Sequence, residues 1–85
     1  MVKQYTKKPV VISAVQFTGE NISEILDFAD NDKNVGYDAE KNQYYIKTLE
    51  GNHYITNGDY IIRGIEGEYY PCKESIFEKT YTEIE

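Results

Sequence analysis

The sequence predicts an α+β fold, in which a small, mostly antiparallel sheet forms as a meander of hairpins and one short helix follows the first strand. Helical spacing of apolar residues occurs clearly once, within residues 19–30. Strand-sized runs separated by turn residues fill most of the remaining chain. With 85 residues, the chain forms a single domain, residues 1–85, with one modest core.

The first strand and the helix are predicted from adjacent segments. "PVVISAVQF", residues 9–17, has β-branched and apolar residues at both odd- and even-numbered positions, which is typical of a strand covered on both faces. The helical period then begins at Ile22. Asn21 and Glu24 have the spacing of a capping box, so we expect the helix to start there.

The second half of the chain predicts consecutive strands. A short strand around Val35 and Tyr37 is followed by the runs "YYIKTLE", "NHYI", "DYIIRG" and "EYYPCK". Asn57-Gly58 favours a type I′ turn that would pair "NHYI" directly with "DYIIRG". Gly64 and Gly67 bracket the next turn.

The end of the chain is expected to return to the sheet. "KESIFEK" has the length of one helical turn or a wide loop, with Ile76 and Phe77 pointing inward, and "TYTEI" would form a final strand. The expected core consists of Val11, Val15, Ile25, Leu26, Ile46, Tyr60, Ile62, Tyr70 and Phe77.

Charge is distributed unevenly along the chain, whose net charge is -6. Lys3, Lys7 and Lys8 precede the first acidic residue, so residues 1–8 are expected to form a basic, flexible arm. The acidic remainder would repel phosphates, which argues against nucleic acid as the main partner. The N-terminal segment lacks the apolar run of a signal peptide, and no apolar stretch is long enough to span a membrane. The single cysteine suits a reducing cytoplasm.

Residues for catalysis or metal binding are scarce in this sequence. His53 is the only histidine and Cys72 the only cysteine, so neither a catalytic triad nor a four-ligand zinc site is predicted. Asp27, Asp30 and Asp32 are clustered but lack the pattern of a calcium loop. We therefore predict no enzyme activity, no metal and no cofactor.

The candidate binding residues are Arg63, Tyr44, Tyr45 and Tyr69. Arg63 is the only arginine, and it would either pair with a carboxylate such as Asp59 or anchor an anionic group of a partner. Glu68 is a second candidate for that carboxylate. The adjacent tyrosines of each pair, 44–45 and 69–70, must point to opposite faces of a strand, which leaves one ring of each pair available to a partner.

Two long segments carry a family resemblance. "KKPVVISAVQFTGENISEILDF" and "GDYIIRGIEGEYYPCKESIFEKTY" resemble small phage and prophage proteins of low-GC Gram-positive bacteria, and the similarity covers nearly the whole chain. The family commonly has proline after the lysine of "CK", where this sequence has Glu74. The resemblance implies a phage-encoded accessory protein of the host cytoplasm, and it implies no activity or catalytic residue.

Two functions are compatible with these observations. The first is a non-enzymatic inhibitor or adaptor, with counter-defence among its roles, that binds a basic face of a host protein through an acidic, tyrosine-bearing surface. The second is a protein that binds or sequesters a small, nucleotide-like ligand, with tyrosines stacking and Arg63 or the arm lysines holding phosphate. A homo-oligomer would extend such a site.

Overall fold

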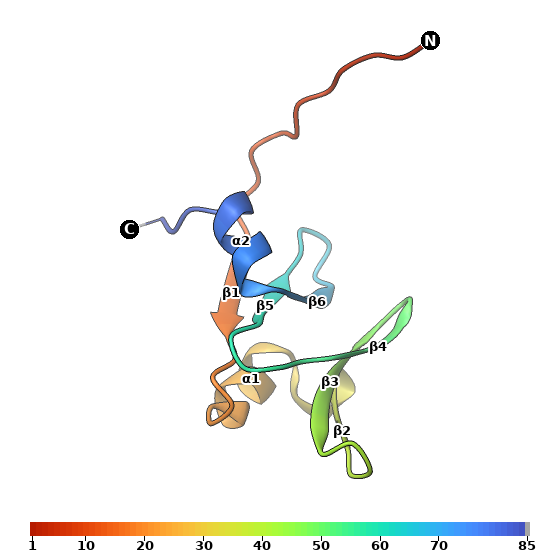
Figure 1. The fold of residues 1–85 in the computed structure, drawn as a ribbon, viewed down its shortest axis with the longest axis vertical. Coiled ribbons are helices and arrows are strands. Elements are labelled where there is room, and N and C mark those ends of the chain that lie inside the picture. Colours follow the sequence, from red (N-terminus) through yellow and green to blue (C-terminus); the bar gives the residue numbers. More distant parts are fainter. Residues whose placement is uncertain (85) are drawn as a thin grey trace.

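Six strands form two three-stranded antiparallel sheets in the computed structural model, which describes residues 1–84 (Figure 1). The first sheet has the order β1-β5-β6, with β1 at Ser13–Gln16, β5 at Tyr60–Arg63 and β6 at Tyr69–Cys72. The second has the order β2-β3-β4, with β2 at Val35–Asp38, β3 at Gln43–Thr48 and β4 at Gly51–Tyr54. Helix α1 spans Ile22–Phe28, a 3₁₀ turn spans Asn31–Lys33, and α2 spans Glu74–Thr80.

The predicted α+β class and the helix after the first strand are therefore confirmed. The expected single sheet is instead divided in two, and a second helix is present. Neither helix of residues 1–84 has the length and apolar character needed to cross a membrane.

The main core lies between the two sheets and α1. Its buried members are Phe17, Ile25, Ala29, Val35, Ile46, Ile55 and Ile61. The expected core positions Ile25, Ile46 and Ile62 are buried, and Val15 and Leu26 pack against the core from its margin.

Helix α2 covers the opposite face of the first sheet. Phe77 stacks on Tyr60 with ring centroids 3.8 Å apart, while Ile62 is buried outside the main core cluster. Tyr60, Tyr70 and Phe77 are half-buried on this side. The expectation that Ile76 points inward is wrong, because its side chain is exposed on the outer side of α2. The expected final strand is also wrong, since residues 81–84 form none.

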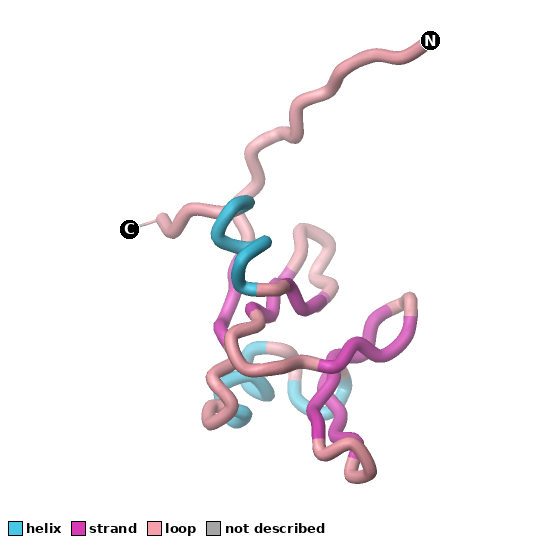
Figure 2. The backbone as a smooth tube through the Cα atoms, in the orientation of Figure 1, coloured by secondary structure: helices cyan, strands magenta, loops and turns pink. Residues whose placement is uncertain are grey.

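Strand β1 is much shorter than the predicted segment 9–17. Its register pairs Ser13 with Arg63, and the chain turns away from β5 at Gly64, so residues before Ser13 have no strand beside them. The core assignment of Val11 is wrong for this reason, because Val11 is 76% exposed. Figure 2 shows the preceding residues as a long extended segment that leaves the domain.

The Asn57-Gly58 turn has a different type and a different role from those predicted. Asp59 donates its backbone N–H to the Thr56 carbonyl at 3.0 Å, and Gly58 has a φ of 95°, which together match a type II turn. Positive φ among the non-glycine residues of the 1–84 range occurs only at Asp30, Asn31 and Asn42. The turn carries the chain from one sheet to the other, so β4 and β5 do not pair.

Asn21 precedes α1 as expected but does not cap it through its side chain. Its Oδ1 accepts the Thr18 N–H at 2.8 Å, and its Nδ2 donates to the Gln16 carbonyl and to Glu24 Oε1, both at 2.8 Å. The side chain therefore fixes the link between β1 and α1 instead of forming the predicted capping box.

Replacement of Gly58 by valine should lower the free energy of unfolding by about 1 to 2 kcal/mol, because a β-branched side chain is strained at positive φ. A Cβ at Gly58 would meet only the Glu74 carboxylate, at 3.5 Å, so the effect isolates the backbone conformation. Chemical denaturation measures the loss. Gly58→Asn is the control, because asparagine tolerates this region and should cost less. Equal stability of the valine variant and the wild type would contradict the turn.

Candidate binding surfaces

The outer face of the second sheet carries two ordered tyrosines. Ile46 points into the core, so its neighbour Tyr45 points to the opposite side of β3. Tyr45 pairs with Tyr54 of β4 across the sheet, and the two rings meet edge to face with centroids 5.8 Å apart. The Tyr45 ring lies over Gly36 of β2, where any Cβ would overlap it. We call this surface, formed by Gly36, Asp38, Lys41, Tyr45 and Tyr54, the tyrosine face.

Polar contacts hold the tyrosine face in place. The Tyr54 hydroxyl donates to Asp38 Oδ2 at 2.6 Å, and Lys41 places its ammonium 4.6 Å from the centroid of the Tyr54 ring. Asp38 Oδ1 accepts the backbone N–H groups of Glu40 and Lys41 at 3.0 and 3.2 Å. The Tyr54 hydroxyl bond, followed by the Lys41 N–H, lowers the pKa of Asp38, and the same carboxylate raises the pKa of Tyr54. Both aromatic rings are thus preordered for contact.

The four residues proposed from sequence do not form one site. Tyr44 faces inward, where its ring meets Phe17 edge to face at 6.4 Å, whereas Tyr45 lies on the tyrosine face. Tyr69 also packs against the core, with its ring 5.6 Å from that of Phe28. The structure brings Arg63 and Tyr69 together as directly paired residues of β5 and β6.

Arg63 does not form the ion pair expected from sequence. The ion pairs among residues 1–84 join Lys33 to Asp30 and Lys73 to Asp59, and Arg63 is exposed. Asp59 is instead buried and pairs with Lys73 at 3.3 Å, since Asp59 lies in the turn before β5, at the opposite end of that strand from Arg63. Glu68 turns back on the Gly64–Glu68 loop and accepts the Glu66 N–H at 3.2 Å.

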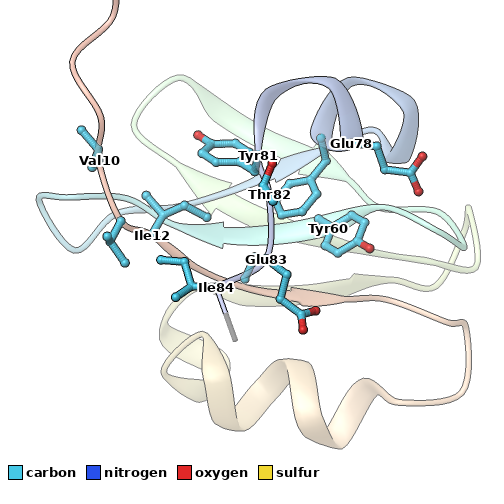
Figure 3. Close-up of a pocket in the computed structure, with 11 residues that line it drawn as sticks. Val10, Ile12, Tyr60, Glu78, Tyr81, Thr82, Glu83 and Ile84 are labelled. Carbon is cyan, nitrogen blue, oxygen red and sulfur yellow. The ribbon is translucent and has the colours of Figure 1, made fainter.

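Open depressions lie beside these elements. A cleft of about 740 Å³ separates the β3–β4 hairpin from β6 and is bordered by Lys47, Leu49, His53, Tyr69 and Tyr70. A groove of about 470 Å³ runs between the N-terminal segment and α2 (Figure 3). Val10, Ile12, Ala14, Tyr60, Phe77 and Ile84 supply its apolar lining, and Glu78 and Glu83 supply its carboxylates.

The tyrosine pair of β6 divides between the two faces of its sheet. Tyr69 faces the core, whereas Tyr70 lies on the side of α2 and the C-terminal residues. Burial, reinforced by the neighbouring Tyr81 hydroxyl, raises the pKa of Tyr70 to about 12. Tyr70 is therefore a neutral structural phenol at physiological pH. Neither Tyr69 nor Tyr70 offers a fully exposed ring to a partner.

The single cysteine and histidine do not combine into an activated pair. Both border a small depression between β4 and β6 that also includes Asp59 and Lys73. Burial raises the pKa of the Cys72 thiol, which is the opposite of what a nucleophilic cysteine needs. Within residues 1–84, no three side chains among His, Cys, Asp and Glu lie together in a way that could hold a metal ion.

Comparison with protein families, with curated proteins and with solved structures gives no match to this chain. The candidate surfaces therefore rest on their own geometry. Of these, the tyrosine face has two half-buried tyrosine rings that are held in place by an edge-to-face contact and a hydrogen bond.

Sequence reasoning missed Tyr54 and Asp38 as members of this surface. The run "NHYI" shows that Tyr54 belongs to a strand, but its partner depends on the register between β3 and β4. The signal that could have found it is the pairing of Tyr45 with a second tyrosine across the short turn at Leu49-Glu50.

Replacement of Tyr54 by phenylalanine should raise the pKa of Asp38 toward its ordinary value of 3.8, because the variant loses the main hydrogen bond to the carboxylate. Because its folded-state pKa is lowered, the Asp38 carboxylate stabilises the fold at pH values above its pKa in the unfolded chain. This stabilisation is lost as the pH falls through the folded-state pKa. Carboxyl carbon NMR measures the titration. Tyr45→Phe, which keeps the Tyr54 hydroxyl, is the matched control and should leave the Asp38 pKa unchanged. An unshifted Asp38 pKa in Tyr54→Phe would contradict the assigned bond.

Proposed function

We propose that this chain is a phage-encoded, non-enzymatic accessory protein that binds a host protein in the host cytoplasm and acts there as an inhibitor or adaptor. The observation that carries the proposal is the tyrosine face, in which two tyrosine rings are ordered on a sheet surface that no helix of residues 1–84 covers (Figure 1). The phage origin and the cellular location are supported by the resemblance of the two long terminal segments.

Interface energetics favour such a surface. Tyrosine buries a large apolar area with few rotatable bonds, so a preordered tyrosine loses little entropy when a partner covers it. Tyr45 is already fixed by Gly36 below it and Tyr54 beside it, and Tyr54 is fixed by Asp38. These rings are rigid before binding, which makes them suitable anchors.

The charge of the protein predicts the chemistry of the partner. The formal net charge is -6, Asp38 belongs to the tyrosine face, and Glu40 lies in the turn that follows β2. Complementary potentials accelerate association and select against partners of the same sign. We therefore expect a host protein with a basic face, and binding that weakens as ionic strength increases.

Tyr45→Ala should reduce capture of the partner by about tenfold or more, since central aromatic anchors contribute about 2 kcal/mol or more to an interface. Wild-type and variant proteins are immobilised, the host protein retained by wild type is identified and purified, and its Kd for each variant is measured. Thermal denaturation of each variant confirms that measurements are made well below unfolding.

Tyr5→Ala is the matched control, because it removes an equally large ring that is 88% exposed and lies far from the second sheet in the N-terminal segment. The control should bind as wild type does. Equal affinity of Tyr45→Ala and wild type, or equal loss in both variants, would contradict the tyrosine face as the binding surface.

The cleft between the sheets favours ligand binding as a second function. Its volume of about 740 Å³ lies within the usual range for small-molecule sites, and it is bordered by His53 and by the half-buried Tyr69 and Tyr70. Its cation, Lys47, shares the lining with Glu50 and Glu68 and donates to the Asp32 carbonyl at 2.9 Å, so the charge balance supports a stacked aromatic ligand better than a polyphosphate.

Native mass spectrometry of protein purified from infected cells tests this second function. A retained small molecule should appear as a fixed mass increment above the 9.9 kDa chain. The increment should disappear in His53→Ala. It should remain in the control variant Tyr54→Phe. A spectrum with only the unliganded mass, together with unchanged melting in the presence of nucleotides, would exclude ligand sequestration.

A further inference from the structure

We propose that two copies of this chain associate through the outer edge of β1, so that residues 10–14 of each copy pair in antiparallel fashion and join the two β1-β5-β6 sheets. This dimer uses a different surface from the tyrosine face and does not depend on the proposed function. Four observations carry it: an open strand edge, an unpaired strand-forming segment, the position of Pro9, and complementary charges.

The backbone of β1 is paired on one side only. The sheet order places β1 at its edge, and no strand of residues 1–84 lies beyond it. Phe17 donates its N–H to the Asp59 carbonyl at 2.8 Å, so odd-numbered residues of β1 direct their backbone groups toward β5. Ala14 and Gln16 therefore direct theirs outward. Exposed edges of this kind are sites where another strand adds.

Asn21 closes one end of this edge and leaves the other end open. The Gln16 carbonyl accepts Asn21 Nδ2 at 2.8 Å, which blocks further pairing at that point. The open edge begins at Ala14 and continues into Ile12 and Val10, which precede β1 in the same extended segment (Figure 2). An added strand must therefore pair with residues 10–14.

The same residues have strong strand-forming character and no partner. The sequence "PVVI" before β1 is β-branched, yet Val10 and Val11 are 41% and 76% exposed. Val10, Ile12 and Ala14 also line the apolar groove beside α2 (Figure 3). A strand added at the edge would extend this groove and remove these side chains from water.

Pro9 has the parity that this pairing requires. Continuing the alternation of β1, residues 10, 12 and 14 face the outer edge, whereas Pro9 faces the side of β5, where no strand continues past Arg63. Its missing N–H therefore costs no hydrogen bond at the open edge. If Val10 pairs with Ala14 of the second copy, the two-fold axis passes between the two Ile12 residues, which lie directly opposite each other.

Charge selects a second copy as the occupant. In this register Lys8 of one copy lies opposite Gln16 of the other and points to the same face of the sheet. Gln16 Nε2 contacts the Glu74 carboxylate, so Glu74 borders the position at which Lys8 arrives. The basic arm of each copy thus reaches an acidic surface of the other, and the two-fold axis repeats the contact.

Cysteine cross-linking tests the position of the axis. In a Cys72→Ala background, Ile12→Cys should form a disulfide-linked dimer under mild oxidation, because directly opposed residues of antiparallel strands have Cα atoms about 5.5 Å apart, within disulfide range. Leu49→Cys in the same background is the matched control: Leu49 is fully exposed in the β3–β4 turn and should remain unlinked.

Charge exchange tests the contact between copies. Light scattering should give twice the 9.9 kDa mass for the wild type. Lys8→Glu and Glu74→Lys alone should each raise the dimer Kd by about tenfold, because each change affects two symmetric contacts. The double variant Lys8→Glu/Glu74→Lys should recover most of the wild-type affinity.

Three results would overturn the proposal. The first is a monomer mass at every concentration up to the solubility limit. The second is a dimer that Ile12→Cys does not link and that is insensitive to Lys8 and Glu74, since such a dimer uses another face. The third is selective linkage of Ile12→Cys to a different protein, which would assign the edge to a foreign strand.

Discussion

The buried carboxylate of Asp59 is the interaction on which the arrangement of the two sheets depends. Asp59 is 3% exposed, and its Oδ2 accepts the Thr56 N–H at 2.9 Å and the Thr56 hydroxyl at 3.2 Å. Lys73 supplies the compensating charge at 3.3 Å. Separating Lys73 from Asp59 would leave the buried carboxylate without a compensating charge, which is energetically costly. One side chain thereby fixes both the turn between the sheets and the start of α2.

The consequences of this turn extend to both faces of the first sheet. Gly58 donates its N–H to the Phe17 carbonyl at 2.7 Å, which attaches the turn to the end of β1 and aligns β5 beside it. Lys73 is the residue before α2, so its bond to Asp59 directs that helix over Tyr60. With α2 on one face and the core on the other, the first sheet has two edges without a paired strand within residues 1–84, at β1 and at β6, and β6 lies beside the β3–β4 hairpin. The second sheet keeps its outer face, which carries Tyr45.

The periodicity of the sequence was sufficient to predict the α+β class, α1 and most strands, because these depend on local apolar spacing. It was not sufficient for the pairing of β5, which depends on contacts between residues far apart, such as Gly58 with Phe17. Asn57-Gly58 is compatible with two turn types, and the tertiary bond selects between them. For the candidate site, parity predicted one inward and one outward tyrosine in the 44–45 pair. It could not predict that Tyr45 meets Tyr54, because that follows from strand register.

The two proposed surfaces reinforce each other because they belong to different sheets. Pairing at the β1 edge leaves Tyr45 and Tyr54 uncovered in both copies, since these residues lie in the second sheet. A two-fold dimer then presents two identical tyrosine faces. Binding of the first face to an oligomeric or clustered host protein raises the effective concentration of the second, so the apparent affinity exceeds that of one face without any additional contact. A chain of 85 residues can in this way bind tightly although each face offers only a small area.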